Sequence, residues 1–438
     1  MNRRRVVVTG IGMISPVGLS ASECWYALLA GRAAGAPIPA EWSRYTTTTS
    51  KIWAALPPID WEAMGISRIE QMQLDASGML TILAAQEALQ DAGIGASVVD
   101  AKKHTFRLEG PEPNRCGVFM GTGVGGVSSC LGNFTNHSFT AVRHAIADQS
   151  LLPPMPPRFN PYAVPAMMPN AMSALPGIRW SLRGPNLTFA QACAAGTVAV
   201  GHAFRSIASG AVDLALAGGA EYVGDPYGGM FRGFDAARTL ASGADWATAN
   251  RPFDRDRTGF LLAEGGAGVL VCEEAESAQR RGARAYAEIA GYAENFDGYS
   301  IMMMDPSGTR IADMIVAAVQ DAGCTPSDID YINAHGTGTA LNDEIESAVI
   351  ERLFGAKPIV NATKSLTGHC IGGSGGIEAA VTALSLAHQA THACHNLENP
   401  IRDLRFARES GPYRIDTAIT QSFAFGGHNA AVVMKKIG

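Results

Sequence analysis

The sequence has little of what marks several common classes of protein. Only 17% of its 438 residues are charged and the formal net charge is −6, so basic side chains are not in excess. Because binding to a nucleic-acid backbone depends on such an excess, no nucleic-acid partner is expected. No apolar run approaches the roughly 18 residues that a membrane-spanning helix needs, so no membrane span is expected either.

Patterns for export and for disulfides are also missing. The apolar stretch after the basic N-terminal residues is broken by Gly10, Gly12 and Pro16, and no small-residue cleavage site follows closely. The eight cysteines contain no Cys-x-x-Cys pair and are scattered through apolar segments. That usage suits a reducing compartment better than a disulfide framework, so we expect a cytoplasmic protein.

What is present is the composition of a packed globular chain, with 47% hydrophobic residues and 49 glycines. Short β-branched runs alternate with alanine-rich helical patterns, which predicts an α/β fold with mainly buried strands. The length is too great for one simple core and predicts two domains or two fused halves. We place the boundary near Arg251–Gly259, giving units of residues 1–255 and 256–438. The proline-rich Leu151–Pro169 is predicted to be an irregular loop.

The individual elements follow from the hydrophobic periodicity. The predicted strands include Arg5–Thr9, Cys116–Gly121, Leu214–Gly218, Gly268–Cys272, Tyr331–Ala334 and Asn429–Met434. The predicted helices include Asp75–Ala92, Val198–Ser209, Arg310–Ala322, Asp343–Phe354 and Ile377–Ala387.

The first candidate catalytic residue is Cys193, in the segment TFAQACAAGTVAVGHAF. Asn186–Ala190 is predicted to be a short buried strand and Ala194–Ile207 a helix, which places Cys193 in the first turn of that helix. Unpaired N–H groups and the helix dipole there favour the thiolate, which is the reactive form. Its small neighbours leave room for a substrate, although an isolated buried cysteine is more often structural.

A second candidate site lies in YINAHGTGTALNDEIES, residues 331–347. A buried strand ends there in His335, and α/β folds position reactive side chains at strand ends. The glycines that follow let backbone approach a ligand, and the hydroxyls of Thr337 and Thr339 could bind a polar ligand tail. The alternative is a structural histidine at a strand end.

Two further glycine-rich segments carry candidate residues. In NATKSLTGHCIGGSGGIEAA, Lys364 and His369 precede a turn that enters a helix carrying Glu378. Such a turn can cradle a phosphate, but here the lysine precedes the glycines, unlike in a nucleotide-binding P-loop. In SFAFGGHNAAVV, two glycines follow an aromatic residue just before the last strand.

Cys193, His335 and His369 together form a Cys–His–His set. Side chains of these types could ligate zinc, but their order and separation match no compact zinc spacing, so no metal is predicted. The shorter cluster at residues 392–395, HACH, is interpreted as a polar loop.

The order of these segments resembles the β-ketoacyl synthase family of the thiolase superfamily. The resemblance runs nearly end to end and rests on VVVTGIGMISPVG, RGPNLTFAQACAAGT, ALAGGAE, RPFDRDRTGFLLAEGGAGVLVCEE, NAHGTGTALND, TKSLTGH, NLENP and SFAFGGHNAAVV. It implies two similar halves in a five-layer α-β-α-β-α sandwich, normally dimeric. It also implies an acyltransferase that condenses an acyl chain with a malonyl unit on acyl carrier protein, with no metal or redox cofactor.

The resemblance assigns the catalytic roles. It makes Cys193 the nucleophile that holds the acyl chain as a thioester. His335 and His369 become hydrogen-bond donors that stabilise the enolate formed when the malonyl group loses CO2. Lys364 is the lysine of the family's motif, and Glu378 is the acidic residue that supports it.

The resemblance also assigns the substrate side of the site. Thr337 and Thr339 would bind the pantetheine arm, and Phe425 would be the gating aromatic whose N–H completes an oxyanion hole. In relatives that elongate fatty acids, a phenylalanine at the position of Ala163 usually closes the acyl pocket at the dimer interface; a shift by one residue would put Tyr162 there. The smaller Ala163 favours a longer or bulkier chain and a type II polyketide synthase over fatty acid elongation.

Other interpretations remain beside this one. A thiolase would need a second catalytic cysteine in its C-terminal glycine-rich motif, and FGGHN has none. A non-catalytic chain-length factor would usually replace the nucleophile, whereas Cys193 is present. The dimer could be a homodimer or a heterodimer with such a subunit. The segment matching the family's basic carrier-docking region, Ser67–Asp75, has Arg68 as its only basic residue, which predicts weak electrostatic docking or docking shared with a partner subunit.

Overall fold

One mixed ten-stranded sheet runs through the protein, in the order β12-β11-β15-β16-β10-β1-β9-β8-β6-β7. The computed structural model describes residues 3–42, 47–148, 160–243 and 245–438, with the backbone alone in 139–148. The first five strands are β1 (Val6–Ile14), β6 (Cys116–Gly121), β7 (Asn186–Phe189), β8 (Leu214–Tyr222) and β9 (Gly265–Glu274). The others are β10 (Ala287–Phe296), β11 (Tyr331–Asn333), β12 (Ile359–Asn361), β15 (Thr417–Phe423) and β16 (His428–Lys435).

The sheet consists of two sets of five strands with the same topology. Numbered within its own set, each set has the strand order 3-2-4-5-1. In both sets strand 2 pairs in parallel with strands 3 and 4, and the remaining pairs are antiparallel. The sets join where Val6–Val8 pairs with Ala287–Ile289. This repetition confirms the expectation of two similar halves.

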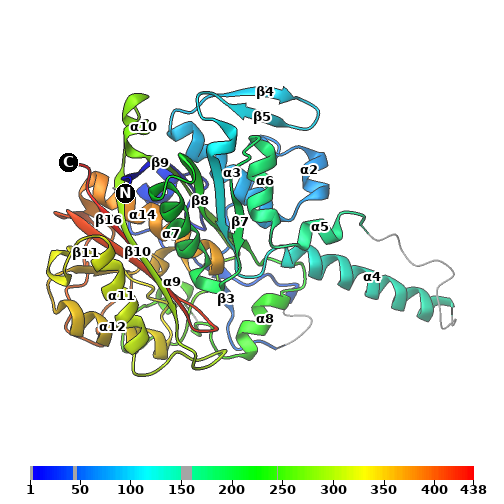
Figure 1. Ribbon diagram of the computed structural model, residues 1–438. Helices are drawn as coiled ribbons and strands as arrows, with labels where there is room; N and C mark the ends of the chain where they lie inside the picture. Colours follow the sequence, from blue (N-terminus) through cyan, green and yellow to red (C-terminus); the bar gives the residue numbers. More distant parts are fainter. Residues whose placement is uncertain (1–2, 43–46, 149–159, 244) are drawn as a thin grey trace.

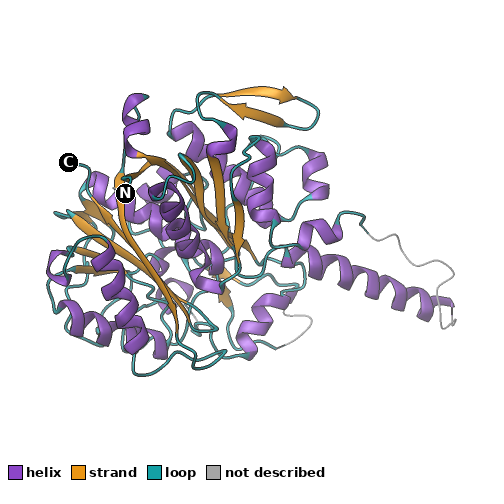
Figure 2. Ribbon diagram, viewed as in Figure 1, coloured by secondary structure: helices purple, strands orange, loops and turns teal. Residues whose placement is uncertain are grey.

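Helices make the layers on either side of each set (Figures 1 and 2). Helix α3 (Ala76–Asp91) packs on β1, β8 and β9, and α11 (Thr309–Asp321) packs on β10 and β16. Between the two sets lie α7 (Ala195–Ala208) and α14 (Ser374–His388), which contact each other and strands of both sets. With α12 (Ala340–Phe354) beside α11, the layers are α-β-α-β-α as expected.

The two central helices meet at their first turns. A Cβ atom on Gly196 would lie 2.6 Å from the amide nitrogen of Gly376, and one on Gly375 would lie 2.4 Å from that of Thr197. Only glycines allow such a close backbone approach. The starts of α7 and α14, which follow the segments of Cys193 and His369, are therefore held side by side.

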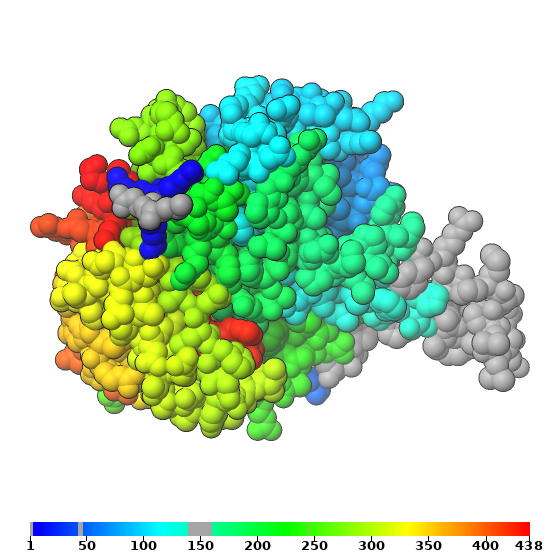
Figure 3. Space-filling view, in the orientation of Figure 1, coloured from blue at the N-terminus to red at the C-terminus, as the bar shows by residue number. Residues whose placement is uncertain are grey.

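The remaining elements surround this core. The helices are α1 (Ala21–Leu29), α2 (Arg68–Gln73), α4 (Val127–Asp148), α5 (Ala163–Met167), α6 (Ala171–Arg179), α8 (Gly229–Ala236), α9 (Trp246–Ala249), α10 (Ala275–Arg280) and α13 (Lys364–Thr367). The strand pairs are β2 (Ala36–Pro37) with β3 (Ile52–Trp53), β4 (Ala96–Asp100) with β5 (Thr105–Leu108), and β13 (Ala390–Thr391) with β14 (Gly411–Pro412). Most of the first half, coloured blue to green, lies beside the second half, coloured yellow to red (Figure 3).

The structure confirms the named strands and helices to within a few residues and corrects two expectations. Strand β7 is at the edge of the sheet, and Leu187 is 46% exposed, so the prediction of a buried strand here is wrong. Hydrophobicity alone cannot tell an edge strand from a central one. Within the predicted loop Leu151–Pro169, residues 151–159 lie outside the described residues, and Ala163–Met167 forms the short helix α5.

The division at residues 255 and 256 stays a prediction about domain organisation. In the sheet, β9 still pairs with β1 and β8 of the first set. No helix in the described part of the chain is both long and apolar enough to cross a membrane.

Candidate active site

Cys193 lies in a tight turn between an edge strand and the central helix α7. The turn Ala192–Ala194 is a single 3-10 turn, so the cysteine directly precedes α7 instead of lying in its first turn. Ala192 adopts a left-handed conformation with φ +46°, which is uncommon for a residue with a side chain. Sharp turns of this kind aim a side chain away from its strand and are frequent at functional sites.

Burial controls the ionisation of this thiol. Cys193 is 5% exposed, and loss of solvation raises the pKa of its thiol to about 12. The positive charge of Lys364 and the backbone N–H of Phe425, which donates to the sulfur, act in the opposite direction. The effect of the helix start, which was expected to favour the thiolate, is outweighed here, because the second half of the protein covers the sulfur and removes water from it.

His335 follows β11 and is oriented by a buried ion pair. Lys364, at the start of α13, donates to His335 Nδ1 at 3.1 Å and to the His335 carbonyl at 2.8 Å. The same ammonium group donates to Glu378 of α14, and both charged side chains are almost fully buried. Since Lys364 has only donors to offer, Nδ1 of His335 accepts and Nε2 carries the proton.

His369 is oriented by the turn that follows it. The Ile371 N–H donates to His369 Nδ1 at 3.2 Å. Ser374 Oγ lies 2.9 Å from the same nitrogen and accepts from the Cys370 N–H, so its own proton is free for Nδ1. Nε2 of His369 therefore carries a proton as well, and it lies 3.1 Å from Cys193 Sγ.

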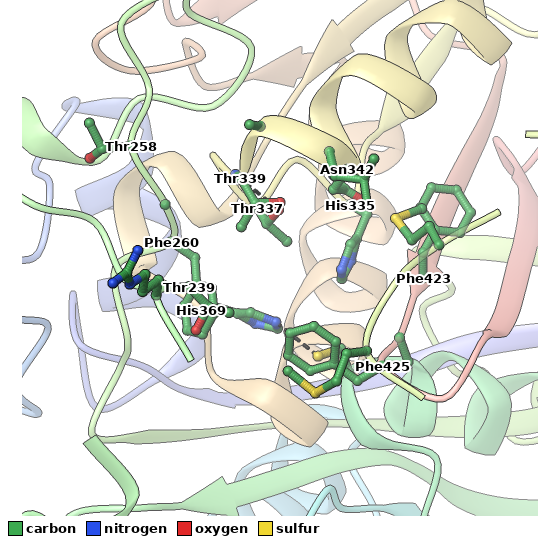
Figure 4. A pocket seen from close by; sticks show the side chains of 18 residues that line it. Thr239, Thr258, Phe260, His335, Thr337, Thr339, Asn342, His369, Phe423 and Phe425 are labelled. Carbon is green, nitrogen blue, oxygen red and sulfur yellow. Dashed lines mark hydrogen bonds between the residues drawn. The ribbon is translucent and has the colours of Figure 1, made fainter. Parts of the chain in front are cut away.

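Cys193, His335 and His369 converge on one point from three segments. One sulfur or nitrogen atom from each lies within 4.8 Å of the others. Burial and the charge of Lys364 lower the pKa of both imidazoles well below the usual value, so both are neutral at pH 7. The imidazole rings of His335 and His369 point toward the same space (Figure 4). The arrangement presents one thiol and two neutral N–H donors.

This donor set does not suit a metal ion. A metal-binding histidine offers one bare nitrogen to the ion and donates from the other to an acceptor. Here Nδ1 of His335 faces the Lys364 ammonium group and Nδ1 of His369 faces the Ile371 N–H. The nitrogens that face Cys193 thus carry protons, and a cation would also meet the nearby ammonium charge.

The three side chains open into a cavity of about 290 Å³. Thr337 and Thr339 line it, with their hydroxyl groups 2.9 Å apart, and Phe425 lines it from the turn before β16. Gly426 and Gly427 follow Phe425 with φ of +87° and +84°, a backbone that favours glycine. The structure thus brings the two threonines and Phe425 together with the three converging side chains. Figure 4 shows the threonines and Phe425 around the two histidines.

Ala163 lies apart from this cavity. It is 2% exposed, in α5, and it is not among the described residues that line the cavity. Its expected role in closing an acyl pocket at a dimer interface stays a prediction. The HACH segment is also different from expectation, because His392 and Cys394 are buried and not part of a polar surface loop.

Sequence reasoning missed several residues that shape the site. The Phe260 ring packs edge-on against His369, with ring centroids 5.2 Å apart, and Met302 and Met304 also line the cavity. Ser374 lies in the glycine-rich segment NATKSLTGHCIGGSGGIEAA that the sequence analysis selected. Its position five residues after His369 is the only feature of the sequence that indicates a contact with that histidine. Phe260 lies in the quoted segment RPFDRDRTGFLLAEGGAGVLVCEE but was not selected as a site residue, and Met302 and Met304 lie in no segment that was selected.

Two family models match almost the whole chain. Residues 3–278 match "Beta-ketoacyl synthase, N-terminal domain" and residues 286–398 match "Beta-ketoacyl synthase, C-terminal domain". A curated relative, 3-oxoacyl-[acyl-carrier-protein] synthase 2 of Synechocystis sp., is 35% identical, with 100% of this chain and 99% of the relative covered.

Solved structures agree with these matches over the full length. A type II polyketide ketosynthase in complex with its acyl carrier protein and bound to a hexaketide, AntDE:AntF, aligns with a TM-score of 0.83 at 27% identity, covering 100% of both chains. The ishigamide ketosynthase/chain length factor aligns with a TM-score of 0.82 at 30% identity, again over 100% of both chains. The chain belongs to the β-ketoacyl synthase family of acyltransferases that form carbon–carbon bonds.

Proposed function

We propose that the protein condenses a Cys193-bound acyl chain with a malonyl thioester on acyl carrier protein, with loss of CO2. The observation that carries this proposal is the convergence of the Cys193 thiol with two neutral Nε2–H donors in one cavity. A thiol accepts an acyl group, and paired neutral donors suit a developing oxyanion or enolate.

The first step transfers the acyl chain to the protein. Cys193 Sγ attacks the thioester carbonyl of the carrier, the new C–S bond forms, and the carrier thiol leaves with the proton of the cysteine. The Phe425 N–H, which helps to lower the pKa of the thiol, donates to the oxygen that becomes negative. Thr337 and Thr339 bind the pantetheine arm along the cavity wall.

The second step uses the two histidines. The malonyl thioester loses CO2, and the electron pair of the broken C–C bond becomes an enolate. Nε2–H of His335 and Nε2–H of His369 donate to its oxygen, each donor contributing roughly 2.7–4 kcal/mol of barrier lowering. The enolate carbon attacks the acyl–Cys193 carbonyl, and the sulfur leaves as a thiolate that takes up a proton from water, so the product is a β-ketoacyl thioester on the carrier.

The buried Lys364–Glu378 pair supports this step without touching the substrate. Lys364 keeps His335 Nδ1 unprotonated and so fixes which nitrogen donates. Glu378 balances the buried ammonium charge. Neither side chain is among the described residues that line the cavity.

For the substrate, we favour an acyl chain of the type II polyketide kind. Support comes from the small side chain of Ala163 and from two structural relatives that are ketosynthases, one of them bound to a hexaketide. Fatty acid elongation is the second candidate, and it is favoured by the curated relative named 3-oxoacyl-[acyl-carrier-protein] synthase 2. A cytoplasmic location is part of the proposal, supported by eight free cysteines.

We further propose that the active protein is a dimer. Strand β7 leaves one edge of the sheet unpaired in this chain, and Leu187 on it is exposed. Tyr162 and Val164, at the start of α5, and Met168, just after it, expose further apolar surface. The second subunit is another copy or a chain-length-factor-like partner, as in the ketosynthase/chain length factor relative. A catalytic role for this chain is favoured over the partner role because Cys193 and both histidines are present.

The test uses intact-mass measurement with acyl and malonyl carrier proteins. The wild-type protein gains the mass of the acyl group, Cys193→Ala does not, and His369→Ala does but releases CO2 from the malonyl carrier far more slowly. Loading of Cys193→Ala, or its full condensation activity, would overturn the proposal. Ala163→Phe then separates the two substrate classes, because it shortens the product or blocks long chains only if this position borders the acyl pocket.

A further inference from the structure

A buried carboxylate next to the active site has no role in the chemistry described above. Glu221 lies near the end of β8 and is fully buried. Its side chain points toward a contact between the two halves of the protein, formed by the loop after β6 and by the turn Ile371–Gly373 that precedes α14.

Four donors from these segments converge on the two oxygens of Glu221. Oε1 accepts from the hydroxyl of Thr122 at 2.9 Å and from the N–H of Val124 at 3.3 Å. Oε2 accepts from the N–H of Gly123 at 2.5 Å and from the N–H of Gly372 at 3.2 Å. Three donors thus come from the first half of the protein and one from the second.

The contact has no room for side chains other than that of Glu221. A Cβ atom on Gly372 would lie 2.3 Å from the amide nitrogen of Gly123, and one on Gly123 would lie 2.7 Å from Glu221 Oε2. The two backbones therefore touch, and the carboxylate is the acceptor that their N–H groups share.

The turn held by Glu221 is the one that orients His369. Ile371, its first residue, has a left-handed φ of +46°, a costly conformation for a β-branched residue. In that conformation the Ile371 N–H donates to His369 Nδ1, and Nε2 of the same ring reaches Cys193 Sγ. Such strain persists only where surrounding contacts hold it.

We infer that Glu221 is a positioning residue for catalysis, which holds the turn Ile371–Gly373 so that Nε2–H of His369 is aimed at the reacting atoms. This inference rests on the proposed function, because it concerns the donor for the enolate. Glu221 acts through the Gly372 and Ile371 backbone and does not touch the substrate.

Replacing the carboxyl group with an amide of nearly the same shape tests the inference. In Glu221→Gln, the side-chain amide presents its own N–H groups to one pair of donors, so that pair loses its acceptor. We expect kcat for decarboxylation of the malonyl carrier to fall roughly 10–100-fold with KM within about twofold of wild type, because a small misplacement of a catalytic group costs up to 10²-fold. Thr337 and Thr339, on another loop, keep binding the carrier arm. The rate of acyl loading onto Cys193 should fall by a smaller factor than the rate of decarboxylation, and the two factors should differ by at least about fivefold.

Glu273→Gln is the matched control. Glu273 is a buried carboxylate of the neighbouring strand β9 that accepts from Thr9 and pairs with Arg281, and it lies outside the catalytic cavity. Its replacement should lower the melting temperature while leaving kcat for decarboxylation within about twofold of wild type. Equal losses of loading and decarboxylation in Glu221→Gln, or losses like those of Glu273→Gln, would overturn the inference.

Glu221→Asp is the second variant if Glu221→Gln does not fold. It keeps the charge but is one methylene shorter, so it reaches fewer of the four donors and should show a smaller loss of the same kind. A folded Glu221→Asp with wild-type decarboxylation and loading overturns the inference. If instead wild-type protein with intact Cys193 neither loads acyl groups nor releases CO2, the proposed function itself has failed.

Discussion

At the scale of single residues, opposing effects act on the pKa of the Cys193 thiol. Burial favours the neutral thiol, and so do the negative charges of Glu221 and Glu378. The charge of Lys364 and the N–H groups of Phe425 and His369 favour the thiolate. Burial is the largest of these, and it raises the pKa to about 12. A substrate thioester therefore meets a protonated sulfur that is already surrounded by donors suited to a negative charge.

This balance predicts the pH dependence of alkylation. Because the thiolate is the reactive form and its pKa lies far above neutrality, the rate of Cys193 modification by iodoacetamide should rise about tenfold per pH unit between roughly pH 6 and 9. Peptide mass spectrometry measures this rate, with Cys193→Ala identifying the modified site. A rate that levels off below about pH 8 would show that the donors outweigh burial.

The buried pair Lys364–Glu378 carries a second prediction at this scale. Lys364→Met leaves Glu378 buried without its cation and should lower the free energy of unfolding by about 3–5 kcal/mol. It also removes the donor to His335 Nδ1, so decarboxylation should fall by roughly 10²-fold.

Adding Glu378→Gln separates the two effects. The double variant has no unpaired buried charge, so urea unfolding should show most of the stability restored, while decarboxylation stays low because His335 still lacks its partner. Recovery of both quantities together would contradict the orientation role given to Lys364.

Some residues of the site could be predicted from the sequence and others could not. The local pattern made Cys193, His335 and His369 candidates, because each lies beside small residues where a strand or a short helix ends, and the resemblance to the family then assigned their roles. The protonation of Cys193 was not predictable, because its burial depends on residues more than 100 positions away in the chain, such as His369. Phe260 belongs to a quoted motif, but its contact with His369 depends on the tertiary fold, and Met302 reaches the cavity from a segment without any motif.

At the scale of elements, the start of α7 decides where Cys193 lies. Gly121, the last residue of β6, faces this start closely, and a Cβ atom there would lie 2.2 Å from the carbonyl carbon of Ala195. Backbone cannot yield as a flexible side chain can, so Gly121→Ala should displace the helix start. We expect a loss of about 1–3 kcal/mol in unfolding free energy.

Gly121→Ala should also load acyl groups more slowly than wild type under conditions where both proteins are folded. Intact-mass measurement follows the loading rate. The control is Gly233→Ala in α8, where a Cβ atom would meet open space. That change should leave loading unaltered and stabilise the helix by about 0.5–1 kcal/mol. Equal loading by Gly121→Ala and wild type would mean that α7 accommodates the methyl group without moving Cys193.

The sequence predicted best the central strands, because a continuous run of apolar residues indicates a buried strand. Cys116–Gly121 was predicted with the bounds that β6 has in the structure, and Gly268–Cys272 lies inside β9. Strand β7 was predicted in the right place but with the wrong burial, because an edge position is set by strand order and not by composition. Helix α5 was missed, since prolines before and within Ala163–Met167 indicated a loop.

The edge strand β7 leads to a prediction about assembly. An exposed edge pairs readily with another strand, and a charged side chain placed on it hinders such pairing. Leu187→Lys should therefore shift the protein from dimer to monomer in analytical ultracentrifugation, without unfolding it as seen by circular dichroism. Ile178→Lys on α6 is the control, because Ile178 is also exposed, at 63%, but lies off the strand. An unchanged dimer in Leu187→Lys would place the interface elsewhere.

At the scale of the whole molecule, charge is sparse on the surface expected to meet the carrier. On α2, Arg68 is paired with Glu62 at 2.7 Å, while Ile69 and Met72 are 63% and 68% exposed. Contact through apolar side chains depends little on ionic strength, whereas contact between free charges is screened by salt.

We therefore expect carrier binding to be insensitive to salt. The dissociation constant for an acyl carrier protein, measured by calorimetry, should change less than roughly threefold between low and physiological salt. Ile69→Ser should weaken binding more than Arg68→Gln does. A tenfold loss of affinity on adding salt would show instead that basic residues outside this segment carry the docking.

The repeated strand order has a consequence for how such a protein can change over evolution. Each set of strands leads through a short turn that begins with a left-handed residue, Ala192 in one and Ile371 in the other, into a helix of the middle layer. In the proposed reaction the first turn presents the nucleophile and the second orients a hydrogen-bond donor, so equivalent places in the two sets carry different chemistry. A mutation in one turn can thus abolish one half-reaction while the other turn and the sheet stay intact. Related proteins that keep only one of the two half-reactions can therefore arise without a new fold.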